Sequence, residues 1–504
     1  MELVILHSND THGHLLPIPT PSGETLGGYA RRSTFVKRQR ARHPNLLLLD
    51  AGDLYQGSRF WHAFHGAPDI QLMNLLEYDA VTLGNHDTDK GSELLAERIN
   101  EARFSWLSAN MTFPDDHVLF DQWRPFVIKA FEGVRVGIFG LTVDAMELFP
   151  EDFRDHVTVM QEVEAAAKMV DILRDQVDLL VMLSHLGHIG DCAVAESVSG
   201  IDVIIGGHSH TPLERVHEVN ETPIVRAIVG TTQMGKLTFL AAPGRRALLQ
   251  SYELIPIDDT YENDPIVAAE VERWVEQLPP TTVLGQLATA LDTRTEVKTL
   301  AESTAGNFFA DALKYYFSDE VDLTFVHMGT VRGDRIYGPG DFTNHDLSEY
   351  HPFDNPPMLM EINAPQLKVI LERGVSDLPR AVGVFLSHAG LKVTVDPSRQ
   401  PQVIDQDRPR LKTHGQRVLS AEFNGQAVDF RDASQTFRVA MDGYMGRGGA
   451  GYRIVRAARN VRQAPLGAGR IIEQYLRECS PVSTDLGGRI IFANDSEANA
   501  NGRG

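Results

Sequence analysis

Residues 1–13 read MELVILHSNDTHG, an apolar run followed directly by a cluster of polar side chains. Residues 3–6 have the length and composition of a strand that is buried on both faces. Asp10 and His12 follow it two positions apart, so their side chains leave the same side of an extended chain. Open α/β sheets carry their sites beyond the carboxyl ends of their strands. This stretch therefore predicts both a sheet and the position of its site.

The same arrangement recurs along the first half of the chain. Further apolar runs with the length of buried strands lie at 45–49, 80–83, 136–139, 179–183 and 203–205. Helical patterns lie between several of them, such as 92–103 and 162–174. Strands buried on both faces with helices between them predict a layered α/β domain.

Five short polar motifs close the predicted strands. They are Asn9-Asp10-Thr11-His12-Gly13, Gly52-Asp53, Gly84-Asn85-His86-Asp87, Ser184-His185-Leu186-Gly187 and Gly206-Gly207-His208-Ser209-His210. A single aspartate at a strand end is usually a turn residue, and a single histidine is usually hydrogen-bonded in the core or on the surface. Five such motifs in this order are hard to assemble by chance. Their oxygen and nitrogen donors suit manganese, zinc, iron or cobalt.

Composition limits the class of protein. The chain has 504 residues, with 42% apolar and 23% charged residues, as expected for a globular protein of two or three domains. Its formal net charge of -21 argues against a nucleic acid polymer or an anionic membrane as partner, but leaves small anionic substrates open. The residues before the first strand do not resemble a signal peptide, and Cys192 and Cys479 are the only cysteines, so we expect a cytoplasmic protein.

The chain also divides into parts. We expect a metal-binding α/β domain at 1–258 and a helical linker at 259–284, with a helix at 265–278 that ends at Pro279-Pro280. A second α/β domain is predicted at 285–491, with a helix near 305–316 and a strand near 323–327. Residues 492–504 are mostly small and polar, which predicts a disordered tail.

The motifs together resemble the calcineurin-like metallophosphoesterase signature and, more narrowly, the 5′-nucleotidase family, over nearly the whole chain to about residue 480. The resemblance implies a four-layer α/β sandwich followed by a smaller α/β domain that binds the substrate. It also implies two divalent metal ions. The first ion would be held by Asp10, His12 and His210, the second by Asn85, His185 and His208, and Asp53 would bridge both.

The resemblance further assigns the chemistry. Two divalent ions about 3.5–4 Å apart share a hydroxide and direct it at phosphorus. His86 would sit beside the scissile phosphate, oriented by Asp89, and would either stabilise charge or protonate the leaving oxygen. The remaining histidines near the motifs are interpreted as surface residues or outer neighbours of the ligands: His14, His62, His65 and His188. Asp87 is interpreted as an exposed turn carboxylate.

Substrate-binding residues are predicted in the second domain. Residues 302–313 resemble the opening helix of the family's substrate domain, with Ser303 or Thr304 as its cap. Phe353 and Tyr444 match the two aromatic walls that clamp a nucleobase, although either could instead be a core aromatic. Arg332 matches the family's arginine and could grip phosphate or carboxylate with its planar fork.

The second domain also departs from the family pattern. The loop that usually reads Asn-Gly-Gly-Gly-x-Arg contains His327, Met328 and Thr330, so we expect a bulkier loop in which His327 lines the substrate site. Ala450 replaces an acid that binds ribose, and Thr299 replaces an arginine for which Lys298 is a possible substitute. A site that loses hydrogen-bonding partners loses discrimination, so recognition of a standard nucleoside is in doubt.

The sequence therefore predicts a dinuclear-metal phosphohydrolase that acts on small phosphate monoesters, with 5′-nucleotides as the leading substrates. Alternatives within the family are a cyclic-nucleotide phosphodiesterase, a nucleotide-sugar pyrophosphatase and hydrolysis of a thiosulfate-type ester. A non-catalytic nucleotide sensor is the alternative from another class, and missing metal ligands would have favoured it.

Overall fold

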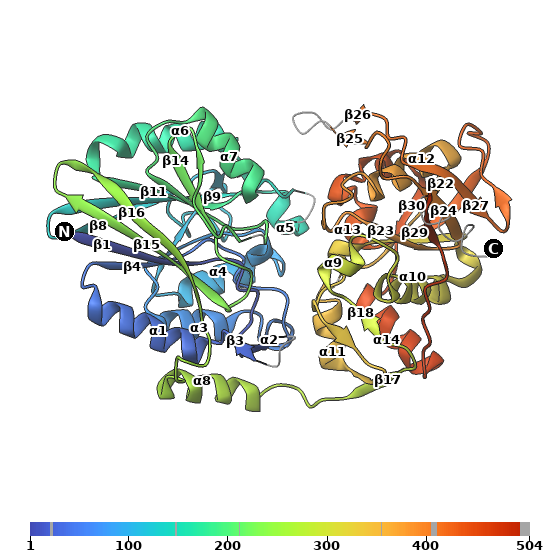
Figure 1. Ribbon diagram of the computed structural model, residues 1–504, viewed down its shortest axis with the longest axis horizontal. Coiled ribbons are helices and arrows are strands. Elements are labelled where there is room, and N and C mark those ends of the chain that lie inside the picture. The colour runs from blue at the N-terminus through green and yellow to red at the C-terminus, as the bar shows by residue number, and fades with distance from the viewer. Residues whose placement is uncertain (21–23, 147–148, 211, 354, 405–410, 494–504) are drawn as a thin grey trace, which may run out of the picture. The chain divides into compact units, whose positions relative to one another are not determined.

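The computed structural model describes residues 1–20, 24–146, 149–210, 212–353, 355–404 and 411–493. The chain forms two compact units, Met1–Pro279 and Pro280–Gly504, called here the amino-terminal and the carboxyl-terminal unit (Figure 1). Within the described residues, no helix is long and apolar enough to cross a bilayer.

The amino-terminal unit is built on two mixed sheets. The first has the strand order β16 (Arg245–Pro256), β15 (Gln233–Ala242), β1 (Glu2–Ser8), β4 (Leu46–Asp50), β5 (Ala80–Thr82) and β6 (Ser105–Leu107). The second has the order β13 (His217–Val219), β14 (Thr222–Val225), β12 (Val203–Gly206), β11 (Leu179–His185), β9 (Val134–Thr142) and β8 (Phe126–Phe131). The strands that precede the five motifs run parallel to one another within each sheet, which brings their carboxyl ends to one edge.

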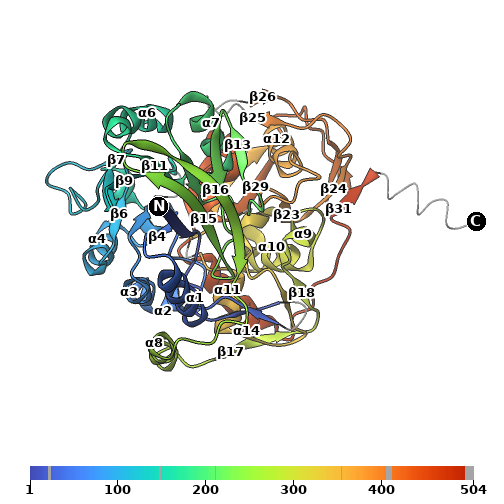
Figure 2. The ribbon, with the colours of Figure 1, turned by 60° about the vertical axis from the view of Figure 1, so that its left-hand side comes forward.

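Helices cover the outer face of each sheet. They are α1 (Tyr29–Arg42), α2 (Arg59–Phe64), α3 (Ala67–Leu76), α4 (Ser92–Glu101), α5 (Glu151–Arg154), α6 (Glu162–Leu173), α7 (Gly187–Ser197) and α8 (Pro265–Glu276). Figures 1 and 2 show α1, α3 and α8 on the outer side of the first sheet and α6 and α7 on the outer side of the second. The unit is therefore the four-layer α/β/β/α sandwich that the sequence predicted.

After Glu2, the side chains of β1 are buried on both faces of the strand. Leu3 and Ile5 are fully buried in the core between the two sheets, together with side chains of β11 and β12. Val4 and Leu6 point the other way, into the core between the first sheet and its helices. Each such buried side chain contributes on the order of 1.5–3 kcal/mol. Both faces of the strand are thus apolar, and only its end is free to carry polar ligands.

Short elements complete the amino-terminal unit: β2 (Ile18–Pro19), β3 (Thr25–Leu26), β7 (Met111–Thr112), β10 (Thr158–Val159), and the 3₁₀ turns His86–Thr88 and Arg174–Gln176. The helix expected in the linker is α8, capped by the Asp264 side chain, which accepts hydrogen bonds from the N–H groups of Ile266 and Val267. It lies against α1 and α3, so this part of the predicted linker belongs to the amino-terminal unit.

The carboxyl-terminal unit is also α/β. Its main sheet has the order β23 (Leu386–Ala389), β19 (Leu323–His327), β29 (Thr436–Met441), β22 (Met358–Asn363) and β30 (Arg459–Gln463). A second sheet has the order β28 (Gln426–Ala427), β27 (Val418–Phe423), β24 (Leu391–Val395) and β31 (Ile490–Phe492). Short pairs join β17 (Val283–Leu287) to β21 (Gly340–Thr343), β18 (Leu291–Asp292) to β20 (Ile336–Tyr337), and β25 (Val403–Ile404) to β26 (Leu411–Thr413).

Helices of this unit are α9 (Thr295–Lys298), α10 (Thr304–Phe317), α11 (Asn344–Tyr350), α12 (Ala364–Gly374), α13 (Gly443–Gly446) and α14 (Ala468–Cys479). Helix α10 is the opening helix predicted from the sequence, and Ser303 is its cap, since its side chain accepts a hydrogen bond from Gly306 N–H. Strand β31 pairs in parallel with β24 and includes Phe492, the first residue of the predicted tail. Residues 494–504 of that tail lie outside the described residues.

Candidate metal centre and substrate-binding residues

All seven predicted metal ligands lie at the carboxyl ends of strands in the amino-terminal unit. Strands β1, β4 and β5 of the first sheet lead into Asp10 and His12, Asp53, and Asn85. Strands β11 and β12 of the second sheet supply His185, His208 and His210. The candidate centre thus takes its side chains from both sheets of the sandwich.

One group of ligand atoms combines Asp10, His12, Asp53 and His210, whose donor atoms all lie within 4.8 Å of one another. The Nε2 atoms of His12 and His210 are 3.0 Å apart. His210 Nε2 lies 3.5 Å from Asp10 Oδ1, and His12 Nε2 lies 4.0 Å from Asp53 Oδ2. Two imidazole nitrogens and two carboxylates therefore point at the same small volume.

A second group combines Asp53, His185 and His208, again with donor atoms within 4.8 Å of one another. His185 Nε2 lies 3.1 Å from Asp53 Oδ2. Asn85 directly precedes His86, whose N–H donates to Asp53, and the buried side-chain oxygen of Asn85 has no hydrogen-bond partner among the described residues. Asp53 belongs to both groups, which is the position expected of a bridging carboxylate.

Neighbouring groups fix the orientation of the ligands. His12 Nδ1 lies 3.0 Å from the Tyr55 carbonyl oxygen and His185 Nδ1 lies 2.6 Å from the Ala51 carbonyl oxygen. When each Nδ1–H donates to its carbonyl, Nε2 carries the lone pair that a metal needs. Asn9 donates from its side-chain amide to Asp10 Oδ2 at 2.7 Å, which holds that carboxylate in the same way.

The backbone is strained at most of the ligands. Positive φ angles of 48° to 70° occur at Asp10, His12, Asp53, His208 and His210. Non-glycine residues rarely adopt this region, and such residues concentrate at functional sites. The neighbouring glycines allow the loops to approach closely, because a Cβ at Gly84 would lie 2.2 Å from the Asp53 backbone nitrogen.

The electrostatics also fit a bound cation. Burial, and then the nearby His210, lower the pKa of His12 to about 3, and burial lowers that of His208 to about 4, so both rings are neutral donors. Burial opposes ionisation of Asp53, but the imidazoles of His185 and His86 outweigh it and hold the pKa of Asp53 well below its usual range. Burial also opposes protonation of His185, but the Asp53 carboxylate outweighs it and raises the pKa of His185 to about 10, so this ring carries a proton that a bound cation would displace. A buried carboxylate beside the neutral rings of His12 and His208, with an amide oxygen that has no partner among the described residues, is a set that fits divalent metal ions.

His86 begins the 3₁₀ turn that follows Asn85, and Asp89 comes directly after this turn. The His86 N–H donates to Asp53 Oδ1 at 2.8 Å, and His86 Nδ1 lies 2.9 Å from Asp89 Oδ2. The His86 ring centroid is 5.7 Å from that of His12. The structure therefore brings the predicted catalytic histidine beside the ligand groups, with Asp89 in contact with its ring.

The interpretation of Asp87 as an exposed turn carboxylate is wrong. Asp87 is only 3% exposed, and its carboxylate accepts hydrogen bonds from the N–H groups of Gly84, Asp53 and Leu54 at 2.8, 3.1 and 2.8 Å. These amides lie in tight loops without strand partners, so they need an acceptor. The need of these loop amides for a hydrogen-bond acceptor is the feature of the sequence that could have indicated a buried Asp87. Asn9, which orients Asp10, was also missed.

The four other histidines near the motifs differ in exposure and contacts. His62 and His65 are exposed on and after α2, and His14 is half-buried. His188 lies at the start of α7, where its N–H donates to Ser209 Oγ at 2.7 Å. None of these four belongs to the two ligand groups described above.

In the carboxyl-terminal unit the predicted substrate residues form two pairs. The Arg332 guanidinium lies 5.3 Å from the centroid of the Phe353 ring. The rings of His327 and Tyr444 have centroids 5.3 Å apart, and His327 Nε2 lies 3.6 Å from Asp442 Oδ1. Phe353 and Tyr444 are both half-buried, so neither is a fully enclosed core aromatic.

The departures from the family pattern are accommodated locally. Met328 and Thr330 are buried, against Ser387 and His351 respectively, so their side chains do not add the bulk that we expected on the exposed side of the loop. Ala450 has a φ of 51°, and its carbonyl oxygen accepts a hydrogen bond from Arg373.

Lys298 and Thr299, which stand near the family's missing arginine, are both buried. The Lys298 amine donates to the Val331 carbonyl oxygen beside Arg332. Burial, and then the charge of Arg332, lower the pKa of Lys298 to about 7. Lys298 therefore lies next to the predicted anion-binding arginine.

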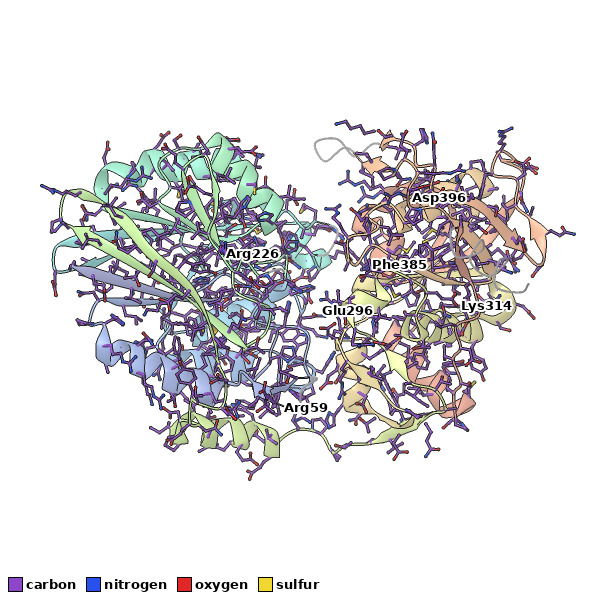
Figure 3. The ribbon with its side chains drawn as sticks, in the orientation of Figure 1. Arg59, Arg226, Glu296, Lys314, Phe385 and Asp396 are labelled. Carbon is purple, nitrogen blue, oxygen red and sulfur yellow. The ribbon has the colours of Figure 1, made fainter. Side chains whose placement is uncertain are left out.

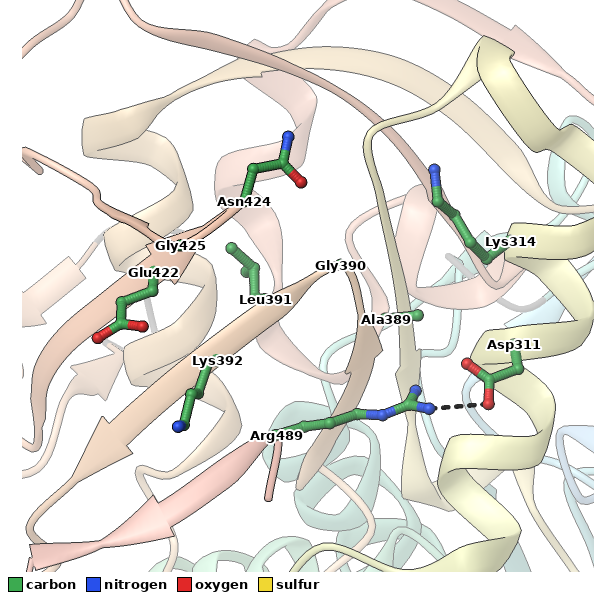
Figure 4. Close-up of a pocket in the computed structure, with 10 residues that line it drawn as sticks. All are labelled: Asp311, Lys314, Ala389, Gly390, Leu391, Lys392, Glu422, Asn424, Gly425 and Arg489. Carbon is green, nitrogen blue, oxygen red and sulfur yellow. Dashed lines mark hydrogen bonds and ion pairs between the residues drawn. The ribbon is translucent and has the colours of Figure 1, made fainter. Parts of the chain in front are cut away.

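A cavity of about 540 Å³ also lies in this unit, but it contains none of the predicted site residues (Figure 4). Its charges are largely compensated, because Arg489 pairs with Asp311 at 2.8 Å and Lys314 donates to the carbonyl oxygens of Ser318 and Val321. The predicted substrate residues therefore do not line this cavity.

Comparison with known proteins agrees with this arrangement. Residues 3–212 match the calcineurin-like phosphoesterase family, and residues 283–457 match the 5′-nucleotidase C-terminal domain. The chain is 28% identical to a snake venom 5′-nucleotidase from Naja atra, over 98% of this chain and 99% of that protein. It is 26% identical to a 5′-nucleotidase from Homo sapiens, over 98% of this chain and 92% of that protein. The crystal structure of a 5′-nucleotidase precursor from Thermus thermophilus is similar with a TM-score of 0.83 and 28% identity, covering 98% and 100% of the two chains.

Proposed function

Because the chain belongs to the family that joins a calcineurin-like phosphoesterase domain to a 5′-nucleotidase C-terminal domain, we propose that it hydrolyses phosphate monoesters at a dinuclear metal centre, with 5′-nucleotides as its substrates. The observation that carries the proposal is the pair of ligand groups that share Asp53. A single-ion site would not need a carboxylate common to two sets of imidazoles.

Divalent ions at such a centre supply Lewis acidity, which lowers the pKa of water and neutralises charge on phosphoryl oxygens. The mixed oxygen and nitrogen donors support manganese, zinc, iron or cobalt. Asp53, Asp10 and the four imidazoles would hold these ions, and backbone carbonyls fix the rings of His12 and His185. Asn85 would supply the additional neutral oxygen donor.

His86 is the protein side chain that we expect to act directly on the phosphate. With Nδ1 directed at Asp89, Nε2 is the ring atom through which His86 would act on a phosphoryl or leaving-group oxygen. The hydrogen bond from His86 N–H to Asp53 keeps the histidine at a fixed distance from the bridging carboxylate. Asp89 acts through His86 and is therefore a positioning residue.

For the substrate, Phe353 and Tyr444 offer ring faces on which a nucleobase can stack. Arg332, partly oriented by Phe353, offers a planar cation for phosphate or carboxylate. His327 contacts the Tyr444 ring and so belongs to the same set of proposed substrate-binding residues. Ala450 removes one acceptor for ribose, so we expect looser discrimination among nucleosides than in a site that binds both sugar hydroxyls.

The test is phosphate release by metal-stripped protein to which manganese is returned. The panel contains 5′- and 3′-nucleotides, ADP, UDP-glucose, 2′,3′-cyclic AMP, sugar phosphates and an aryl phosphate. Metal-dependent preference for 5′-nucleotides supports the proposal. Preference for the cyclic nucleotide or UDP-glucose would replace the substrate class with a diester or a pyrophosphate. No hydrolysis with metals bound would overturn the proposal in favour of a nucleotide sensor.

A further inference from the structure

A second cluster of metal-binding side chains lies in the amino-terminal unit, outside the two ligand groups described above. It consists of His188, Cys192 and His217. His188 and Cys192 are four residues apart on α7, so they lie on the same face of the helix. His217 begins β13, and α7 and β13 lie side by side (Figure 2).

The donor atoms are close to the separations that a tetrahedral metal requires. Cys192 Sγ lies 3.8 Å from His188 Nε2, and the rings of His188 and His217 have centroids 5.0 Å apart at an angle of 65°. All three donor atoms lie within 4.8 Å of one another. Zinc bonds of 2.0–2.3 Å place tetrahedral ligands roughly 3.3–3.8 Å apart, so small rotations of the exposed His217 would complete the geometry.

These side chains are available for a ligand. Cys192 is a free thiol. The Nδ1 atom of His188 is buried and has no hydrogen-bond partner among the described residues. The rings of His188 and His217 meet edge to face. A cation between the donors would explain why two histidines and a thiol gather at one point.

The charges around the cluster are mixed. Burial raises the pKa of the Cys192 thiol, and the carboxylates of Asp191 and Glu196 raise it further, so negative charge lies near the sulfur. Arg226 is the cation close by, and it is fully buried (Figure 3). Its charge is compensated by Asp191, whose carboxylate lies 2.6 Å from the guanidinium.

We propose that His188, Cys192 and His217 form a third metal site, which binds a thiophilic divalent ion of the zinc class and leaves one coordination position to water. A thiolate with two imidazoles is a zinc-type donor set, whereas the dinuclear centre offers no sulfur. The site joins α7 to β13. It also adjoins the dinuclear centre, because His188 N–H is hydrogen-bonded to Ser209, between His208 and His210.

The test uses cobalt as the probe, because a cobalt–thiolate bond gives a near-ultraviolet charge-transfer band that imidazole and carboxylate ligands do not give. Metal-stripped full-length protein is titrated with cobalt, and zinc is then added. We expect the band to appear, to reach the amplitude of one cobalt–thiolate bond per chain and to disappear on addition of zinc. The band reports sulfur ligation alone, so it is independent of phosphatase activity and of the proposed function.

Variants identify the side chains that give rise to the cobalt–thiolate band. Cys192→Ser should abolish it, and His217→Ala should weaken cobalt binding by about 10–100-fold or more, at least the loss seen when groups behind metal ligands are removed. Cys479→Ser removes the other cysteine and should leave the band unchanged. Hydrolysis of the phosphate panel by Cys192→Ser at its wild-type level shows that the variant is folded. Absence of the band in the wild type, or its survival in Cys192→Ser, overturns the proposal.

Discussion

The Asp87 carboxylate accepts a hydrogen bond from the backbone N–H of Asp53, at an N···Oδ2 distance of 3.1 Å. It also accepts hydrogen bonds from Leu54 and Gly84. Asp53 has a φ of 58° and belongs to both metal-ligand groups. A carboxylate from one motif thus holds the strained turn of another, which carries the residue common to both candidate ligand groups.

Replacing Asp87 tests this relationship. In Asp87→Asn an amide NH₂ replaces one acceptor oxygen and faces backbone N–H groups, so the turn at Asp53 should relax. We expect metal affinity to fall about 10–100-fold, the usual loss when a residue behind a metal ligand is changed. The measurement is metal binding by competition with a chelator. The exposed Asp116→Asn is the matched control, and equal affinities in the two variants would contradict the role of Asp87.

His86→Asn should lower the turnover number about 10²–10⁴-fold, the contribution expected of a general acid or base, while KM changes little. Asn can keep a hydrogen bond to Asp89 but cannot carry the proton. Bound metal, measured by elemental analysis, should match the wild type. A wild-type turnover number in a fully loaded variant would remove His86 from the reaction.

Metal removal should destabilise the amino-terminal unit selectively. All four tryptophans, Trp61, Trp106, Trp123 and Trp274, lie in this unit, so tryptophan fluorescence reports its unfolding. Occupancy at 100 times the dissociation constant contributes about 2.7 kcal/mol, which corresponds to a fall in midpoint of roughly 5–10 °C on chelation. An unchanged fluorescence midpoint would argue against metal ions at the centre.

The strands and the ligand motifs were predictable because both leave strong local signals. Residues 3–6 are apolar at every position, which is required when Leu3 and Val4 face two different cores. The burial of Asp87 was not predictable from its own neighbourhood, because Asp53 and Leu54, two of its hydrogen-bond partners, come from a loop about 30 residues earlier. Only the last residue of β31, Phe492, was assigned to the tail, because the pairing of β31 with β24 joins segments nearly 100 residues apart.

Phe353 and Tyr444, the two aromatic residues proposed to bind a nucleobase, allow a test of substrate class. Phe353→Ala or Tyr444→Ala should remove a stacking surface worth about 1–3 kcal/mol, which raises KM for 5′-nucleotides roughly 5- to 150-fold. The same variants should hydrolyse a small aryl phosphate with nearly wild-type kcat/KM. Tyr315→Ala, an exposed tyrosine on α10, is the control. Equal losses on both substrates would indicate a folding defect instead of a lost base clamp.

His7 makes stability depend on pH. Burial lowers its pKa to about 3, whereas an unfolded histidine titrates near 6.5. Between these values the unfolded chain binds one more proton, so this residue costs about 1.4 kcal/mol of stability for each unit that the pH falls below 6.5. Urea unfolding followed by tryptophan fluorescence at pH 7 and pH 5 should show a smaller loss for His7→Phe. Parallel losses in variant and wild type would contradict the assignment.

The ligands of the candidate centre come from the ends of β1, β4 and β5 in one sheet and of β11 and β12 in the other. Any slippage of one sheet over the other would therefore separate Asp53 from His185 and Asp10 from His210. The core between the sheets, where Ile5 and Val181 are fully buried, sets that alignment. Metal affinity in this protein therefore depends on the alignment of the two sheets. We expect the metal centre to form only after the two sheets have packed together.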